Sequence, residues 1–412
     1  MKKIIKNIGE LVTCDEKLNN HQLGLLEDAA ILIEGNEIKD LGHADKIKEW
    51  DRNDCQLIDA GGSSVLPGFI DPHTHFVFGG YRAEEFSWRL QGVPYLEIMK
   101  RGGGIVNTVE STRKVSLNDL KSVSKKRLDS MLSFGVTTVE GKTGYGLDTE
   151  TEIKQLKVMK DLDREHPLDV VATFMGAHAV PKEYSDNKEK FINLIIDEML
   201  PAVKEEGGAE FCDIFCDEGA FTIEESRQVL KRAAELGFKL KIHADEISSV
   251  GAAGLAADMK AISAEHLLKV SDKNISKMAL KGVTPVLLPI TAFSLKEEYA
   301  PARKMINSGL EVALATDFNP GSCYSESIPL LISLATLYMG MTPEEAVRGL
   351  TINAARAINR EDKIGSIKIG KKADLIILDA PSYTHLTYHI GVNIVKKVIK
   401  NGKLVYESKE VR

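Results

Sequence analysis

The middle of the chain repeats one pattern, in which a short apolar run is followed by a loop and a segment of helical periodicity. Apolar runs typical of β-strands occur eight times, as "GFIDPHTH", "GVTTVEGKTGYG", "DVVATFMGAH", "EFCDIFCDEG", "KLKIHADE", "AISAEHL", "GVTPVLLPIT" and "EVALATDFNPG". Helical segments such as 151–166 and 224–237 lie between them. Eight alternations over about 300 residues predict a (β/α)₈ TIM barrel. A doubly wound sheet is less consistent, because it usually shows a Gly-rich dinucleotide turn after its first strand.

The two ends of the chain carry a different pattern, typical of antiparallel strands. The stretch "AAILIEGNEIKDLG" predicts two strands around Gly35-Asn36, and "VKKVIKNGKLVYES" predicts two around Asn401-Gly402. Neither end alone offers enough strands to bury a face. We therefore expect residues 1–65 and 366–412 to form one small β-sandwich domain, beside a catalytic barrel of residues 66–365.

Composition narrows the class of protein. Among 412 residues, 43% are hydrophobic and 27% are charged, which is typical of globular proteins. The net charge of −7 argues against a nucleic-acid partner. No apolar run is long enough for a signal peptide or a membrane span, so we expect a cytoplasmic protein without a membrane partner.

The chain has five cysteines, which are too few and too irregularly spaced for a disulfide framework. Cys212 and Cys216 share one face of a predicted strand. We expect them to be small core residues, because structural zinc takes four ligands.

Polar residues gather where the predicted barrel strands end. They are His73 and His75, Tyr145, His178, Asp217 and Glu218, His243 and Glu246, His266, and Asp317 and Asn319. In a barrel these strand ends meet on one face, where barrel enzymes carry their active sites.

A metal site is the chemistry that this arrangement predicts. His73 and His75 stand two residues apart on a strand and point the same way, although such a pair alone also fits a structural role. His243 ends the fifth strand and Asp317 the eighth, which adjoins the first in a closed barrel. Three imidazoles and a carboxylate suit one Zn²⁺ or Fe ion. Water on such an ion has a pKa of roughly 7, so we expect hydrolysis by metal-bound hydroxide.

Three groups are candidates for catalytic proton transfer: Glu246, His266 and Asp317. Asp317 can both contact the metal and take a proton, while Glu246 and His266 lie on adjoining strands. The alternatives are a salt-bridged carboxylate at the barrel rim for Glu246 and a hydrogen-bonded core imidazole for His266. Spacing does not divide the proton-transfer roles among the three.

"PGFIDPHTH", the histidines ending the fifth and sixth strands and the aspartate of "ATDFNPG" resemble the amidohydrolase superfamily. That resemblance implies a metal-bearing barrel flanked by a β-sandwich built from both termini. "HTHFVFGGYRAEEF", "KTGYGL", "MGAHAVP", "HADE" and "TDFNPGS" look more narrowly like the branch that opens 4-imidazolone-5-propanoate to N-formimidoyl-L-glutamate in histidine degradation. The likeness runs over nearly the whole chain.

The resemblance also implies a set of site residues. The metal ligands would be His73, His75, His243 and Asp317, and the substrate contacts Arg82, Tyr145, His178, Glu246, Asn319, Gly321 and Ser322. A single ion per subunit is expected, because the fourth strand has "FCDEG" where dinuclear relatives carry a bridging lysine. A homodimer is expected from the same resemblance.

Arg82 can bind a propanoate tail bidentately, with an ordinary surface arginine as the alternative. "RGGGI" lacks the Lys-Ser/Thr of a phosphate loop and is expected to form a flexible loop near the barrel mouth, and Lys142 is not a Walker lysine.

Two other functions are compatible with the same scaffold. A nucleobase or aminoimidazole deaminase would release ammonia without opening a ring. A catalytically silent barrel acting as an assembly scaffold would not retain metal. The residues alone do not distinguish zinc from iron.

Overall fold

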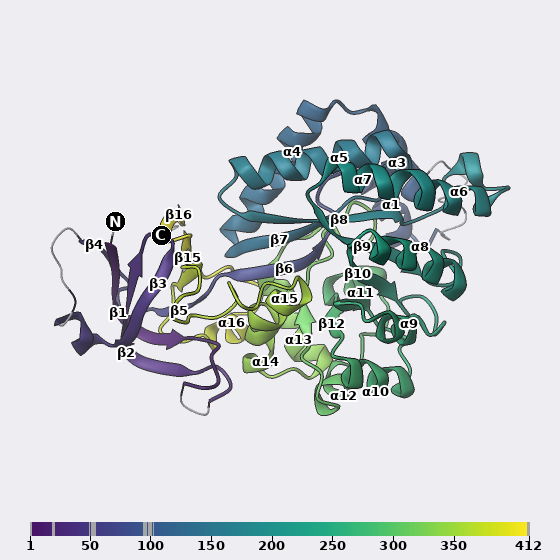
Figure 1. The fold of residues 1–412 in the computed structure, drawn as a ribbon. Coiled ribbons are helices and arrows are strands. Elements are labelled where there is room, and N and C mark those ends of the chain that lie inside the picture. Colours follow the sequence, from purple (N-terminus) through teal and green to yellow (C-terminus); the bar gives the residue numbers. More distant parts are fainter. Residues whose placement is uncertain are drawn as a thin grey trace.

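The computed structural model describes residues 2–18, 21–48, 50, 55–93, 97, 101 and 103–409. Figure 1 shows a larger α/β part and a smaller β part that contains both ends of the chain. In "RGGGI", Gly102 lies outside the described residues, so the loop expected there stays a prediction.

The larger part is built on parallel strands that follow one another in chain order. They are β6 (Phe69–Thr74), β7 (Val136–Lys142), β8 (Asp169–Ala177), β9 (Ala209–Cys216), β10 (Lys239–Ala244), β11 (Ser263–His266), β12 (Thr284–Leu287) and β13 (Ala313–Leu314). The ring closes just beyond β13, where Phe318 forms a parallel bridge with Thr74 and accepts a hydrogen bond from the backbone N–H of His75 at 2.9 Å. The predicted (β/α)₈ barrel is confirmed.

Helices cover the outside of this barrel (Figure 1). After β6 come α1 (Ala83–Leu90), α3 (Ile105–Lys114) and α4 (Leu117–Ser133), and after β7 comes α5 (Thr149–Glu165). The next connections hold η2 (Lys182–Tyr184), α6 (Lys188–Leu194), η3 (Ile195–Met199), α7 (Leu200–Glu206), α8 (Ile223–Glu235), α9 (Ala252–Met259) and α10 (Asp272–Lys281). The last are α11 (Pro289–Leu295), α12 (Ala302–Asn307), α13 (Ile328–Met339), α14 (Pro343–Gly349) and α15 (Ile352–Ala357).

The last two predicted strands are shorter than their apolar runs. Residues 289–291 of "GVTPVLLPIT" begin α11, because Pro289 fits the first turn of a helix. In "EVALATDFNPG" only Ala313 and Leu314 are strand, since the following residues turn to carry Asp317 toward the barrel axis.

The smaller part is one mixed sheet formed by both ends of the chain. Its strands are β1 (Lys2–Val12), β2 (Leu25–Glu34), β3 (Glu37–His43), β4 (Cys55–Asp59), β5 (Ser64–Pro67), β14 (Leu375–Leu378), β15 (Val395–Lys400) and β16 (Lys403–Glu407). The order is β16-β15-β14-β5-β1-β2-β3, with β4 paired to β1. The short helix η1 (Ala44–Lys48) packs against β2 and β3, whereas α16 (His385–Tyr388) packs against α13 of the barrel. Because β5 pairs with both β1 and β14, neither end forms this sheet alone.

Both predicted hairpins are present. Glu34 pairs with Glu37, and Lys400 pairs with Lys403 across Asn401-Gly402. Asn401 and Gly402 have φ angles of 49° and 70°, as a tight two-residue hairpin turn requires. The sheet folds over its own apolar core, in which Ile5, Ile31 and Ile377 pack together. The exact domain boundaries proposed from the sequence stay a prediction.

Buried and partly buried ion pairs join the two parts at the amino end of the barrel strands. Asp169, the first residue of β8, accepts hydrogen bonds from Lys400 at 2.8 Å and from Lys372 at 3.0 Å. Lys400 also contacts Asp374 at 2.6 Å. The small domain therefore contacts the barrel at the end opposite the strand carboxyl ends.

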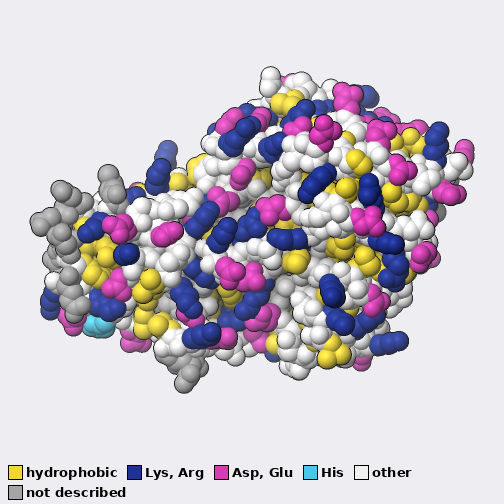
Figure 2. All heavy atoms as spheres, in the orientation of Figure 1, with side chains coloured by type: hydrophobic (Ala, Val, Ile, Leu, Met, Phe, Trp, Pro, Cys, Tyr) yellow, Lys and Arg dark blue, Asp and Glu magenta, His cyan; other side chains and the backbone are white. Residues whose placement is uncertain are grey.

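The visible surface carries charges of both signs. On the face shown in Figure 2, Lys and Arg side chains are interspersed with Asp and Glu. Within the described residues, none of the helices combines the length and the apolar character needed to cross a bilayer. Cys212 and Cys216 are both buried in the barrel core, as expected.

Candidate metal centre and active site

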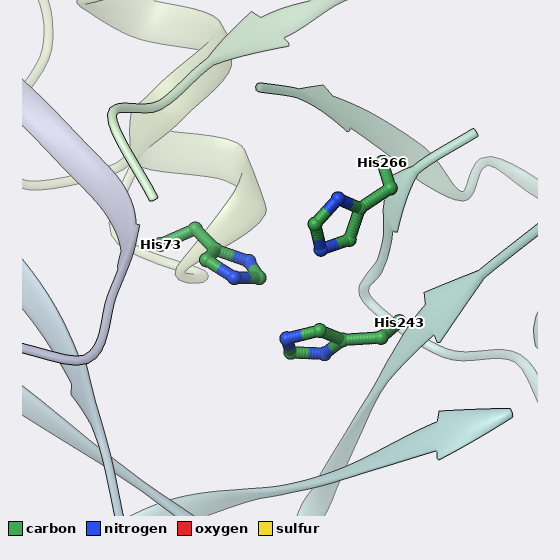
Figure 3. A group of neighbouring side chains, drawn as sticks. All are labelled: His73, His243 and His266. Carbon is green, nitrogen blue, oxygen red and sulfur yellow. The ribbon is translucent and has the colours of Figure 1, made fainter. Parts of the chain in front are cut away.

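Imidazole side chains from separate strands converge at the carboxyl end of the barrel. Figure 3 shows the rings of His73 on β6, His243 on β10 and His266 at the end of β11 pointing toward one another. One ring nitrogen from each lies within 4.8 Å of the others. The ring centroids of His73 and His243 are 4.5 Å apart, and those of His243 and His266 are 5.1 Å apart.

A second group, of His73, His75 and Asp317, shares His73 with the first. Oδ1 of Asp317 lies 3.4 Å from Nε2 of His73 and 3.8 Å from Nε2 of His75. The other carboxylate oxygen accepts a hydrogen bond from the Thr291 hydroxyl at 2.7 Å, which fixes the carboxylate. The four predicted ligands thus lie together, and the structure adds His266 to the groups facing the same space.

Local backbone geometry explains how His266 and Asp317 reach the site. Their φ angles are +67° and +54°, in the left-handed region that residues other than glycine adopt rarely. On β11, Glu265 already points into the barrel, so an ordinary strand would direct His266 outward. The turn of the backbone at His266 brings both side chains to the interior. Strained residues of this kind cluster at functional sites.

Burial favours the neutral form of four imidazoles at the site. It holds the pKa values of His73, His75 and His266 well below their usual range and lowers that of His178 to about 3. Burial also raises the pKa of Asp317 to about 6. Neutral imidazoles have lone pairs available for a metal, and a nearby cation would favour the ionised form of Asp317.

The residues present fit a transition-metal ion. Nε2 of His73 and Nε2 of His243 are buried and have no hydrogen-bond partner among the described residues. Leaving such atoms unpaired typically costs about 1–3 kcal/mol each. Three or four imidazoles with one carboxylate form a donor set that suits zinc or iron better than magnesium or calcium.

Glu246 stands beside this cluster on the loop after β10. Its Oε1 lies 3.4 Å from Nδ1 of His266. Burial, with the negative charges of Asp317 and Asp217, holds the pKa of Glu246 well above its usual range. A carboxyl group with a raised pKa is suited to exchanging protons near neutral pH.

Tyr145 and His178 form one wall of the same space. The ring of His178 stacks on that of His75, with centroids 4.9 Å apart, and Nδ1 of His178 lies 3.1 Å from the carbonyl oxygen of Gly144. The Tyr145 ring is buried 5.3 Å from that of His178. Two of the predicted substrate contacts therefore lie directly against a predicted metal ligand.

Arg82, Gly321 and Ser322 line a neighbouring pocket of about 430 Å³ whose other walls are largely apolar. None of the clustered histidines lines this pocket. Nε of Arg82 contacts Oε2 of Glu85 at 2.8 Å, so this arginine already has a carboxylate partner. The guanidinium also lies against Gly321, where a Cβ atom would come within 2.2 Å of Nη1.

The polar groups of Asn319 are engaged by its own loop. Its Oδ1 accepts the backbone N–H groups of Gly321 and Ser322, both at 2.8 Å. Its Nδ2 donates to the carbonyl oxygen of Asp317 at 2.7 Å. The side chain of Asn319 therefore shapes the loop that carries Asp317.

Sequence reasoning missed a set of charged residues buried in the barrel beneath the histidines. They are Glu140, Lys142, Asp213, Lys241 and Glu265, all fully inaccessible to solvent. They could have been found from the sequence, because charged residues within otherwise apolar barrel strands are rare unless they are paired. Asp213 shows the strength of the pairing: although burial opposes it, His243 and Lys142 hold the pKa of Asp213 well below its usual range.

A family profile and full-length relatives match the sequence. The profile of the amidohydrolase family matches residues 64–405. The imidazolonepropionase of Clostridium tetani is 54% identical over 98% of both chains, and that of Parabacteroides distasonis is 52% identical over 98% of both.

Solved structures resemble the fold at much lower identity. A triazine hydrolase from "Arthobacter aurescens" superposes with a TM-score of 0.73 at 19% identity, over 98% of this chain and 95% of that one. A zinc-bound adenosine deaminase from Xanthomonas campestris gives a TM-score of 0.71 at 17% identity, over 98% and 92%.

Proposed function

This chain belongs to the amidohydrolase family, and we propose that it hydrolyses the ring of 4-imidazolone-5-propanoate to N-formimidoyl-L-glutamate. The observation that carries the proposal is the convergence of His73, His75, His243 and Asp317 at the carboxyl end of the barrel. Relatives named for this activity that are about half identical over nearly the whole length support the choice of substrate.

The proposed cofactor is one Zn²⁺ or Fe ion per subunit, held by His73, His75, His243 and Asp317. When bound, such an ion makes water nucleophilic near neutral pH and polarises a carbonyl oxygen. The buried, unpartnered nitrogens of His73 and His243 support this assignment. The zinc named with the Xanthomonas deaminase belongs to that protein and supports only the choice of a metal on this fold.

The catalytic groups that we propose are Glu246, His266 and Asp317. His266 stabilises negative charge developing on the ring oxygen, because its imidazole faces the same space as the ligand nitrogens. Asp317 or Glu246 takes a proton from the attacking water, and the proton then passes to the ring nitrogen that leaves as the C–N bond breaks. The raised pKa of Glu246 supports this exchange.

Substrate recognition is proposed for Arg82, Tyr145, His178, Glu246, Asn319, Gly321 and Ser322. Arg82 binds the propanoate carboxylate, which requires it to exchange or share its contact with Glu85. Tyr145 and His178 contact the imidazolone ring from the wall formed with His75. Asn319 acts by holding the backbone of Gly321 and Ser322 in place.

The decisive experiment combines elemental analysis with an assay on freshly prepared 4-imidazolone-5-propanoate. We expect about one zinc or iron per chain and loss of the substrate well above its spontaneous rate, with N-formimidoyl-L-glutamate as product. Ammonia release without ring opening would identify a deaminase. Protein that retains no metal and leaves the substrate to decay spontaneously would favour a scaffold and contradict the proposal.

Two further properties are proposed on family resemblance and on sequence. They are assembly as a homodimer, which light scattering tests, and a cytoplasmic location, which fractionation tests. The absence of a nucleic-acid partner is likewise a prediction, supported by the net charge of −7.

A further inference from the structure

Two of the proposed metal ligands rest on buried carboxylates that are themselves paired with buried lysines. Nδ1 of His73 forms a hydrogen bond with Oε2 of Glu265 at 3.0 Å, and Oε1 of Glu265 lies 3.3 Å from Nζ of Lys241. The molecule repeats this arrangement with residues of β10, β9 and β7. Nδ1 of His243 lies 3.1 Å from Oδ1 of Asp213, whose Oδ2 lies 2.8 Å from Nζ of Lys142.

The pattern is the same in both places: each carboxylate uses one oxygen for an imidazole and the other for an ammonium. Glu265, Lys241, Asp213 and Lys142 are all fully inaccessible to solvent. Burying charged groups is costly unless they are paired and hydrogen-bonded, so each carboxylate and its lysine hold one another in place. Alternation along β10 brings the two groups together, because Lys241 of one and His243 of the other stand two residues apart and face the same side.

The chemistry of these groups fixes which imidazole nitrogen carries the proton. A carboxylate only accepts hydrogen bonds, and an ammonium only donates them. The Nδ1 atom that faces Asp213 or Glu265 must therefore be the N–H, and the lone pair of each ring remains on Nε2. In His73, Nε2 is buried and has no hydrogen-bond partner among the described residues. In His243 neither ring nitrogen forms a hydrogen bond within the described residues, and Nδ1 is the one that lies 3.1 Å from Oδ1 of Asp213.

We propose that Asp213 and Glu265 are positioning residues that hold His243 and His73 in the tautomer and orientation needed to bind the metal, with Lys142 and Lys241 fixing the two carboxylates. The inference rests on the proposed metal site and adds to it the groups that prepare two of its ligands. Such partners typically change metal affinity by about 10- to 100-fold.

The test replaces each carboxylate by the amide of the same shape. An amide has a single acceptor oxygen. In Asp213→Asn or Glu265→Gln that oxygen can serve the imidazole or the ammonium, but not both. We expect each variant to bind Zn²⁺ roughly 10- to 100-fold more weakly than the wild type, measured by competition with a chromophoric chelator on metal-free protein.

Glu140→Gln is the matched control. Glu140 is equally buried and contacts the same ammonium as Asp213, with Oε1 2.8 Å from Nζ of Lys142, but within the described residues its carboxylate forms no hydrogen bond or ion pair with an imidazole. Its Oε2 has no hydrogen-bond partner among the described residues. A glutamine can therefore keep the Lys142 contact and present its NH₂ group where Oε2 was. We expect Zn²⁺ affinity within about twofold of wild type, since no positioning contact is lost.

A measurement on the unmodified chain keeps the inference testable if the amide variants fail to fold. In metal-free wild-type protein labelled with ¹⁵N-histidine, the ring nitrogens of His73 and His243 should show the Nδ1–H tautomer. Nε2–H tautomers at both positions would overturn the inference, as would Asp213→Asn and Glu265→Gln proteins that fold and bind Zn²⁺ as tightly as Glu140→Gln.

Failure of the positioning role can be distinguished from failure of the proposed function. If wild-type protein binds no zinc or iron, the metal site itself is wrong. If wild-type protein binds metal and opens the imidazolone ring while the two amide variants keep full affinity, only the positioning role is wrong.

Discussion

Oδ2 of Asp217 accepts the backbone N–H of Glu246 at 2.7 Å. The same oxygen accepts the N–H of Ile247 at 2.9 Å, and Oδ1 accepts both the N–H and the hydroxyl of Ser248, each at 3.0 Å. A single carboxylate at the end of β9 thus fixes the loop that carries Glu246. Asp217, just after the fourth barrel strand, therefore positions Glu246 on the loop that follows the fifth strand.

We therefore predict that Asp217→Asn lowers kcat/KM by roughly 10- to 100-fold, because an NH₂ group would face backbone donors that cost about 1–3 kcal/mol to leave unsatisfied. Metal content should stay at the wild-type level, since no ligand contacts Asp217. The adjacent Glu218 is exposed, so Glu218→Gln is the control and should leave steady-state kinetics unchanged. Equal kinetics of the two variants would contradict a role for Asp217 in placing Glu246.

His243→Ala should remove metal and activity together. Its ring lies closest to that of His73, and the loss of several kcal/mol of metal-derived stabilisation implies a fall in kcat/KM of more than roughly 100-fold. Elemental analysis and kinetics on the same preparation test this. His389→Ala, at an exposed position just after α16, is the control and should keep both. A His243→Ala protein that retains a full complement of metal would exclude this residue as a ligand.

Arg82→Ala should act chiefly on substrate binding. Loss of a charge-assisted pair with the propanoate corresponds to about 2 kcal/mol, or roughly a 30-fold rise in KM. Arg82→Lys should recover part of this loss, because an ammonium keeps the charge but not the bidentate geometry. An unchanged KM for Arg82→Ala would remove the propanoate contact from the proposal.

Gly321→Ala should reproduce the substrate-binding defect without removing any polar group. A Cβ atom at this position would lie 2.2 Å from Nη1 of Arg82, which must then move away. Because the displaced atom is the end of a flexible side chain, the melting temperature should change little. We expect KM to rise about 10-fold. A normal KM would show that the position of Arg82 beside Gly321 does not matter for binding.

Metal affinity should depend on pH through Asp317. Burial raises the pKa of Asp317 to about 6 in the metal-free protein, so below that pH an ion must displace its proton. We expect Zn²⁺ affinity to rise about 10-fold per pH unit up to roughly pH 6 and to level off above it. His73 and His75 add no further dependence there, because burial holds their pKa values well below the usual range. Chelator competition across this range tests the prediction.

Asp317→Asn should bind Zn²⁺ weakly and without that pH dependence. The same raised pKa has a consequence for the stability of the metal-free fold. The contribution of Asp317 to the free energy of unfolding is fully present below the ordinary pKa of an aspartate and is lost as the pH rises through about 6. The free energy of unfolding, measured with denaturant on metal-free protein, should therefore fall with pH in this interval more steeply for wild type than for Asp317→Asn. Parallel pH profiles would contradict the raised pKa.

The barrel and the strand-end residues were predictable because both follow from local periodicity. Alternation on a strand places His73 and Lys241 on inward faces whatever the partner strands are, and eight repeats of strand and helix leave few other architectures. The turns at Gly35 and Asn401 were likewise set by the conformations that these residues adopt. The short eighth strand was not predictable, since the course of "ATDFNPG" depends on contacts with the neighbouring first strand, such as the Asp71 side chain accepting the Thr316 N–H and hydroxyl.

The sequence by itself determined the architecture of this protein and the residue types at the mouth of the barrel, because periodicity and residue chemistry are properties of short segments. Only the tertiary structure decided how those residues meet. It turned His266 toward the other imidazoles through a left-handed backbone angle, and it paired His73 with Glu265 and His243 with Asp213. The first pair joins residues 192 positions apart in the chain and the second joins neighbouring strands, and a buried charge is stable only where the fold supplies its partner.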